Sequence, residues 1–140
     1  QRLLTAATPF LQQSLDGAVV FIASRNVPAP GPGASAYSVA KAGLTQLARV
    51  ASLELGSYGV RVNVLHPDCV YDTGLWSDDV LEGRAEKYGM SVEAYKSRNI
   101  LKKEVTSREV AEMVAVVAGP VFLKTTGAQI PIDGGNDRVI

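Results

Sequence analysis

The sequence predicts an α/β fold in which parallel strands are joined by crossover helices. Short apolar runs rich in β-branched residues alternate along the chain with segments whose apolar residues recur at helical spacing. Residues 18–23 form an uninterrupted apolar run that has the length of a strand. Strands of this kind are typically covered on both faces by the helices that connect them.

The N-terminal part predicts a helix, a strand and a loop. Residues 2–15 carry apolar side chains at helical spacing, although Pro9 indicates a kink or a later helix start. A polar turn leads to a strand over residues 17–23, for which we expect burial on both faces. Residues 24–35 contain three prolines and two glycines, which favour a loop.

A long helix and a second strand follow. Residues 36–55 predict a helix that Gly56 or Gly59 ends. Residues 60–65 predict a strand that stops at Pro67. The apolar face expected for the long helix consists of Val39, Leu44, Leu47, Val50, Ala51 and Leu55.

Residues 71–104 form a predicted helical insert. Within it, residues 80–88 and 92–99 predict two short helices, and Ser91 is the expected N-cap of the second.

The last two elements are a helix and a third strand. Thr106 and Glu109 match a capping box, which predicts a helix over residues 107–118. Residues 127–133 predict a strand, and Pro131 places it at an edge or where no ladder donor is needed.

Composition excludes several classes of protein. The chain has 140 residues, of which 46% are apolar, enough for one small packed domain. Its 14 basic and 14 acidic residues balance, which argues against a nucleic-acid binder. No apolar run approaches the roughly 20 residues that cross a membrane. With one cysteine and one histidine, we expect neither an internal disulfide nor a metal site, and a reducing, cytoplasmic location.

Three polar residues are candidates for chemistry. Tyr37 and Lys41 lie four residues apart, and this spacing places them on one face of the predicted helix. Ser24 follows the first strand, at the carboxyl end where open α/β sheets bind ligands. A lysine ammonium beside a tyrosine favours the phenolate, which makes the hydroxyl a better proton donor and acceptor. Taken alone, a Tyr-x-x-x-Lys pair is more often an ordinary exposed pair.

Four segments, in order, resemble the short-chain dehydrogenase/reductase family. They are Ile-Ala-Ser at residues 22–24, Ala-Tyr-Ser-Val-Ala-Lys-Ala-Gly at 36–43, Gly-Val-Arg-Val-Asn-Val-Leu-His-Pro at 59–67 and Thr-Gly-Ala-Gln-Ile-Pro-Ile-Asp-Gly-Gly at 126–135. The resemblance covers essentially the whole chain. It implies hydride transfer between NAD, with NADP not excluded, and a small aldehyde or alcohol.

The resemblance also implies roles for particular residues. Tyr37 would be the general acid/base, Lys41 would bind the nicotinamide ribose, and Ser24 would orient the substrate oxygen. Asn63 is similar to the family's structural asparagine. The insert over residues 71–104 would lie over the substrate site.

Further expected positions fall in two groups. The residues expected to bind the cofactor are Tyr37, Lys41, Pro67, Asp68 and Val70, where Asp68 replaces the glycine usual in the family. The residues expected to line the substrate pocket are Ser24, Arg25, Asn26 and Trp76. Trp76 and Tyr71 either shape that pocket or anchor the insert.

Two other polar residues receive structural interpretations. His66 is expected to be structural or to line the pocket rather than to catalyse, and Cys69 to be a packed side chain. The charged residues 84–87 are interpreted as a solvated face.

The family's glycine-rich nucleotide loop and its first three strands have no counterpart in this sequence. The resemblance therefore implies that residues 1–140 are the C-terminal half of a Rossmann-type three-layer domain. The alternative is a catalytically inactive, truncated module that serves folding or oligomer assembly.

A narrower resemblance points to the dehydrogenase domain of the bifunctional rhamnulose-phosphate aldolase/lactaldehyde dehydrogenases. It rests on residues 67–70, 74–76, 88–89, 95–96 and 124–129. It implies lactaldehyde or a similar substrate, NAD and an N-terminal aldolase domain in the parent chain. The resemblance to the broader family implies a homo-oligomer.

Overall fold

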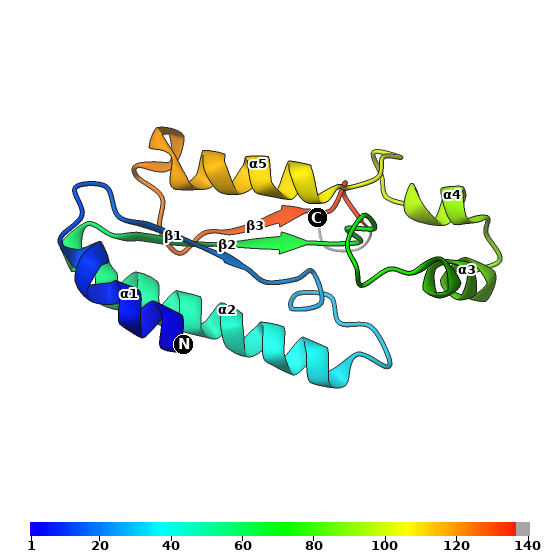
Figure 1. The fold of residues 1–140 in the computed structure, drawn as a ribbon, viewed down its shortest axis with the longest axis horizontal. Coiled ribbons are helices and arrows are strands. Elements are labelled where there is room, and N and C mark those ends of the chain that lie inside the picture. Colours follow the sequence, from blue (N-terminus) through cyan, green and yellow to red (C-terminus); the bar gives the residue numbers. More distant parts are fainter. Residues whose placement is uncertain (137–140) are drawn as a thin grey trace.

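The computed structural model describes residues 1–136 and contains a parallel sheet between two helical layers (Figure 1). The strands are β1 (Ala18–Ile22), β2 (Arg61–Pro67) and β3 (Gln129–Ile132), in the order β1-β2-β3. Both pairings are parallel, and the α/β prediction is therefore confirmed.

Helices cover both faces of this sheet. Helices α1 (Arg2–Gln12) and α2 (Ser35–Leu55) lie on one face, and α5 (Ser107–Ala118) lies on the other (Figure 1). Short 3₁₀ turns, η1 (Gly56–Tyr58) and η2 (Pro120–Phe122), follow α2 and α5. The three layers correspond to the Rossmann-type arrangement expected from the sequence.

The main core lies between α2 and the central strand. Val62 and Val64 of β2 are buried against Ala48 and Ala51 of α2, whose small side chains let the helix approach the sheet. The predicted apolar face of α2 is partly wrong, because Val39 and Val50 are 72% and 40% exposed. The buried residues of α2 are Thr45, Ala48, Ala51 and Leu55.

Three details of the N-terminal part and of β2 differ from expectation. β1 is half-buried and its last residue, Ile22, is exposed, because among the described residues β1 is an edge strand that pairs only with β2. Helix α1 begins at Arg2 and continues through Pro9, so a later start is wrong. β2 includes Pro67, since a proline at the end of a strand needs no ladder donor there.

The predicted caps and the edge position of β3 are confirmed. Thr106 and Glu109 form the capping box of α5, and Ser91 accepts a hydrogen bond from the Ala94 amide. β3 pairs only with β2 among the described residues, which gives Pro131 an edge strand.

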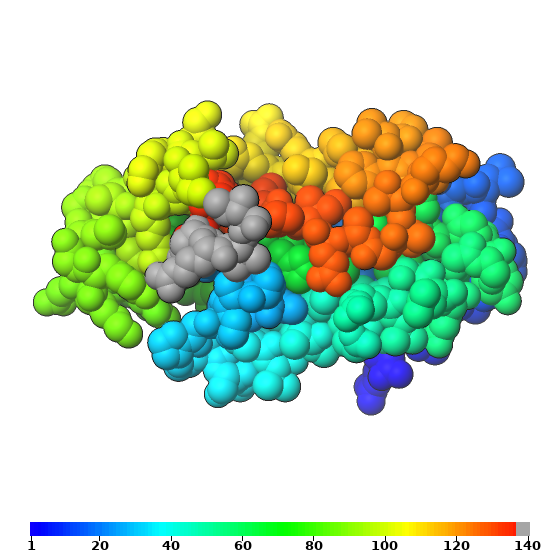
Figure 2. All heavy atoms as spheres, turned by 180° about the vertical axis from the view of Figure 1, so that it is seen from behind, coloured from blue at the N-terminus to red at the C-terminus, as the bar shows by residue number. Residues whose placement is uncertain are grey.

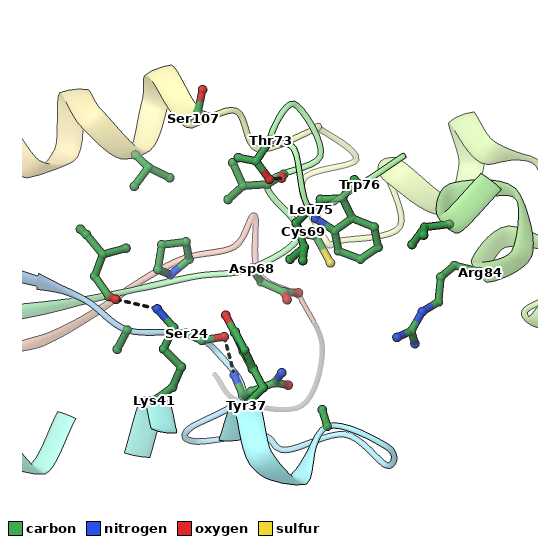
Figure 3. A pocket seen from close by; sticks show the side chains of 18 of the residues that line it. Ser24, Tyr37, Lys41, Asp68, Cys69, Thr73, Leu75, Trp76, Arg84 and Ser107 are labelled. Carbon is green, nitrogen blue, oxygen red and sulfur yellow. Dashed lines mark hydrogen bonds between the residues drawn. The ribbon is translucent and has the colours of Figure 1, made fainter. Parts of the chain in front are cut away.

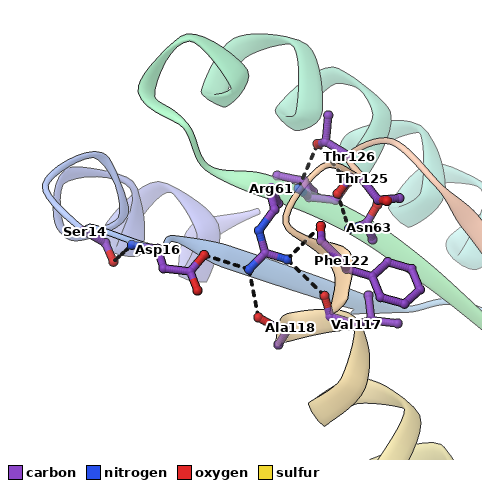
Figure 4. A network of polar contacts seen from close by, with 10 residues as sticks. Ser14, Asp16, Arg61, Asn63, Val117, Ala118, Phe122, Thr125 and Thr126 are labelled. Carbon is purple, nitrogen blue, oxygen red and sulfur yellow. Dashed lines mark hydrogen bonds and ion pairs between the residues drawn. The ribbon is translucent and has the colours of Figure 1, made fainter. Parts of the chain in front are cut away.

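Two buried polar residues of β2 connect the sheet to distant segments (Figure 4). The Arg61 guanidinium donates to the Ala118 and Val117 carbonyls at the end of α5, at 2.8 and 3.2 Å, and pairs with Asp16 at 2.9 Å. These contacts satisfy carbonyl groups that a helix end leaves without partners. Asn63 donates to the Thr125 carbonyl at 2.9 Å, which fastens the connection to β3.

The segment between β2 and α5 has a hydrophobic cluster of its own. Helices α3 (Asp78–Lys87) and α4 (Val92–Lys96) pack around Tyr71, Leu81 and Tyr95. α3 begins two residues before the predicted helix, and α4 ends at Lys96 rather than at residue 99. Within residues 1–136, no helix has the length and apolar character that spanning a membrane requires.

Candidate active site

A cavity of about 710 Å³ opens beyond the carboxyl ends of β1 and β2 (Figure 3). Its lining comes from the ends of these strands, the start of α2, the segment between β2 and α5, and the start of α5. Of the nine residues that the sequence predicted for the site, eight line this cavity: Ser24, Asn26, Tyr37, Lys41, Pro67, Asp68, Val70 and Trp76.

Ser24 is held in place by hydrogen bonds of its carbonyl and of its hydroxyl oxygen. The residue is 7% exposed, and its carbonyl accepts a hydrogen bond from Nδ1 of His66 at 2.8 Å. Its Oγ accepts from the Asn26 amide at 3.2 Å. Since this contact uses Oγ as an acceptor, the hydroxyl proton of Ser24 can be donated into the cavity.

Tyr37 and Lys41 lie on the first turns of α2. Lys41 Nζ donates to the Ile22 carbonyl at 3.0 Å, which fastens α2 to the end of β1 close to Ser24. The same ammonium lies 5.8 Å from the centroid of the Tyr37 ring. Tyr37 is 43% exposed, so its hydroxyl is accessible from the cavity that it lines (Figure 3). The structure thus brings the three predicted residues to one cavity.

The turn after β2 forms another wall. Pro67, Asp68 and Val70 all line the cavity, as the prediction of a cofactor-binding turn requires. The Asp68 carboxylate lies 3.5 Å from the Arg25 guanidinium and accepts a hydrogen bond from Asn136. These contacts explain how an aspartate is accommodated here: its charge is balanced by neighbouring groups at the edge of the cavity.

Cys69 follows in a left-handed conformation, with φ of 53°. Burial, reinforced by the neighbouring Asp68 charge, raises the pKa of its thiol to about 11. The thiol is therefore protonated at neutral pH, which supports the interpretation of Cys69 as a packed side chain.

Arg25 is the one predicted pocket residue that does not line this cavity. It lines a second cavity of about 160 Å³, together with His66 and Gln129. Its guanidinium lies 3.5 Å from the Asp68 carboxylate, and this ion pair occupies a side chain that the prediction had assigned to substrate. His66 Nε2 lies 2.9 Å from Gln129 Oε1, so both ring nitrogens have partners, which supports its structural interpretation.

Trp76 combines both alternatives that the sequence left open. It lines the cavity, and its ring packs edge-on against Tyr71 with 4.9 Å between centroids. Tyr71 is buried in the cluster with Tyr95 and does not line the cavity. Trp76 therefore both shapes the cavity and anchors the insert, whereas Tyr71 only anchors it.

Several lining residues were not predicted. Among them are Cys69, Thr73, Leu75, Val80, Arg84, Ser107 and Val110. The charged residues Arg84, Glu86 and Lys87 are exposed, as the interpretation of a solvated face requires, and Arg84 in addition lines the cavity. Val80 and Arg84 share one face of α3, and their i, i+4 spacing was the available signal. The sequence did not indicate towards which neighbouring element this face of α3 points.

Comparisons with known proteins agree with this geometry. A family model described as enoyl-(acyl carrier protein) reductase matches residues 1–137. An uncharacterized oxidoreductase YuxG from Bacillus subtilis is 38% identical over 128 residues, which are 88% of this chain and 19% of that protein. The short chain dehydrogenase/reductase astE from Aspergillus oryzae is 32% identical over 126 residues, 89% of this chain and 46% of that protein.

A solved structure of similar fold is the NADPH-bound short chain oxidoreductase from Pseudomonas aeruginosa PAO1, which is described as containing an atypical catalytic center. It is 28% identical, with a TM-score of 0.82 over 98% of this chain and 52% of that chain. The chain thus spans about half the length, or less, of these known proteins. The family match over nearly the whole sequence shows that this chain belongs to the short-chain dehydrogenase/reductase family.

Proposed function

We propose that this chain forms the catalytic and nicotinamide-binding part of an NAD(P)-dependent oxidoreductase that interconverts a small alcohol and its carbonyl compound. The observation that carries the proposal is the convergence of Ser24, Tyr37 and Lys41 on one cavity at the carboxyl ends of β1 and β2. Ligands of open α/β sheets bind at this edge.

The residues around Lys41 fit the nicotinamide end of such a cofactor. An ammonium has three donors, and the described residues use one of them at the Ile22 carbonyl. The remaining donors could bind the hydroxyls of the nicotinamide ribose, and Pro67 and Val70, which line the cavity, would help to hold the nicotinamide. When bound, the nicotinamide accepts or gives the hydride. NAD and NADP both fit this proposal, since related proteins include an NAD-dependent oxidoreductase and an NADPH-bound structure.

The protein side chains would transfer the proton and bind the substrate oxygen. The Ser24 hydroxyl, fixed by the Asn26 amide, donates a hydrogen bond to that oxygen. The Tyr37 hydroxyl gives its proton to a carbonyl substrate or takes one from an alcohol. The Lys41 charge beside the Tyr37 ring stabilises the phenolate that remains after the proton has left.

We further propose a small hydroxyaldehyde such as lactaldehyde as substrate, with an N-terminal aldolase domain in a longer, cytoplasmic parent chain. Support comes from the turn at residues 67–70 and the segments 74–76 and 124–129, which resemble the bifunctional aldolase/dehydrogenases. The length of the YuxG relative, of which this chain spans 19%, is consistent with a further domain.

The alternative, an inactive module for assembly, rests on one exposed surface. Val39, Val50 and Leu53 of α2 are exposed, although helices of single domains usually bury such side chains. A homo-oligomer that covers this surface is compatible with the enzymatic proposal as well.

Calorimetric titration of the 140-residue chain with NAD and NADP tests the proposal. We expect saturable binding that is lost in Lys41→Ala and kept in Lys87→Ala, which removes a lysine outside the cavity. Oxidation of small alcohols should then follow the same pattern. Absence of nucleotide binding, combined with concentration-dependent association in sedimentation velocity, would favour the assembly module instead.

A further inference from the structure

The geometry points to Arg84 as the residue that selects the substrate: we propose that it binds a carboxylate or phosphate group carried by the small carbonyl or alcohol compound. This inference rests on the proposed function, since it assigns the far end of the same cavity. Tyr37 and Ser24 hold the reacting oxygen, and Arg84 lines the cavity from α3, on the opposite element (Figure 3).

The orientation of α3 is what directs Arg84 into the cavity. Leu81 and Ala85 are buried in the aromatic cluster, at 5% and 2% exposure, so they fix the face of α3 that packs inward. Val80 and Arg84, one turn apart, then lie along the face that borders the cavity. Figure 3 shows the Arg84 side chain extending from α3 towards the open space in front of Tyr37.

The charge of Arg84 is available for a ligand. Among residues 1–136, ion pairs within 4 Å engage Arg25, Arg61, Lys96 and Arg108, and none engages Arg84. A guanidinium presents a planar pair of donors that matches the oxygens of a carboxylate or a phosphate. An anionic substrate would thus supply acceptors that residues 1–136 do not provide for this side chain as an ion pair.

The rest of the cavity does not repel an anion. Its carboxylate, Asp68, lies against the Arg25 guanidinium and accepts a hydrogen bond from Asn136. Between Arg84 and the reacting end the lining is largely apolar, with Leu75, Trp76 and Val80. This arrangement suits a compound with a short carbon skeleton, its reacting oxygen at one end and its anionic group at the other.

The single tryptophan makes binding measurable without turnover, because Trp76 lines the cavity. We would follow its fluorescence while titrating the chain with two matched pairs of ligands. Pyruvate and hydroxyacetone differ in a carboxylate, and dihydroxyacetone phosphate and dihydroxyacetone differ in a phosphate. We expect one anionic ligand to bind about tenfold more tightly than its neutral partner, and the pair that shows this preference identifies the anionic group.

Variants assign the preference to one side chain. Arg84→Gln should remove the preference and leave the affinity for the neutral ligands unchanged. Lys87→Gln, which removes the same charge from the same helix outside the cavity lining, should retain the preference. Raising the salt concentration should weaken the preference of the unmodified chain, because screening acts on an exposed ion pair.

Several outcomes would overturn the inference. Equal affinities within both pairs, no saturable response to either anion, or an undiminished preference in Arg84→Gln would each do so. If Lys87→Gln also lost the preference, the anion would be attracted by the general positive charge of α3 rather than by contact with Arg84, and the inference would be overturned. NADH binding, lost in Lys41→Ala, decides the proposed function separately. A weaker NADH affinity in Arg84→Gln would assign Arg84 to the nucleotide and equally overturn its role in substrate selection.

Discussion

The two sides of the cavity are built in different ways. The sheet side, defined by Ser24, Tyr37, Lys41 and Asp68, is fixed by contacts that include the backbone of neighbouring elements or an ion pair. The insert side, defined by Leu75, Trp76, Val80 and Arg84, belongs to a segment with α3, α4 and an aromatic cluster of its own. The sheet side is thus coupled to the main core, whereas the insert side packs mainly around its own cluster.

This difference separates chemistry from selection. Proton transfer requires groups held at hydrogen-bond distance, and the register of parallel strands provides that precision. Recognition of the remainder of a substrate tolerates more variation, and a separately packed segment can vary without disturbing the sheet. We therefore expect sheet-side changes to affect every substrate and insert-side changes to alter the choice among substrates.

The largest effect should come from Tyr37→Phe, which removes the proton donor of the sheet side. We expect kcat to fall by about 10³-fold with every substrate. Tyr58→Phe, at an exposed tyrosine of η1 outside the cavity, is the matched control and should keep full activity. A decrease confined to one substrate would contradict the division between the two sides.

The next effect concerns the support of the sheet side. Arg61→Met should lower the free energy of unfolding by about 3 kcal/mol. Removal of the buried guanidinium leaves the carbonyls of α5 and η2 that it contacts without donors. Urea unfolding measures this change. Arg108→Met breaks only an exposed i, i+4 pair and should cost about 0.4 kcal/mol. Equal decreases in the free energy of unfolding would show that the buried contacts of Arg61 contribute no more to stability than an exposed ion pair.

A smaller and more local effect is expected from Tyr95→Leu in the aromatic cluster. The substitution removes ring contacts with Tyr71 and Tyr88 at 5.8 and 5.7 Å, and a contact with the Arg98 guanidinium at 4.7 Å. We expect about 2 kcal/mol less protection of α3 and α4 amides in hydrogen exchange.

Amides of β2 should keep their protection in Tyr95→Leu, and Tyr88→Leu, at a half-exposed ring, should have a weaker effect. If β2 lost protection to the same extent as α3, the insert and the sheet would unfold as one unit. The distinction between the two sides of the cavity would then be incorrect.

The smallest effect is the pH dependence contributed by Asp72, which connects the insert to α5. Its carboxylate accepts hydrogen bonds from the Ser107 hydroxyl at 2.7 Å and the Ser107 amide at 2.9 Å, and these bonds lower its pKa. A lowered folded-state pKa means that the charged form stabilises the fold at neutral pH. This contribution is lost as the pH falls through the folded-state pKa, which lies below the usual pKa of an aspartate.

Asp72→Asn should therefore reduce the difference between the Tm at pH 7 and the Tm at pH 3. Thermal unfolding followed by circular dichroism measures both values. Asp79→Asn, at another exposed aspartate of the same segment, serves as the control and should retain the difference. An unchanged difference in Asp72→Asn would show that the bonds to Ser107 do not contribute to stability.

Elements governed by local patterns were the ones that the sequence predicted well. The capping box at Thr106 and Glu109 and the N-cap at Ser91 depend on hydrogen bonds within three residues, and both are present. The spacing of Tyr37 and Lys41 likewise follows from one helix. The exposure of Val39 and Val50 was not predictable, because periodicity shows that a helix has an apolar face but not which neighbour covers it.

The sequence by itself determined the order and type of the elements, the parallel sheet and the family whose motifs this chain carries. Only the tertiary structure decided which side chains share the cavity: Arg25 turns to Asp68 and leaves it, while Arg84 enters it from α3. The physical reason is the range of the interactions. Helix and strand formation depend on neighbours along the chain, whereas the composition of a cavity depends on how separately formed elements pack against one another.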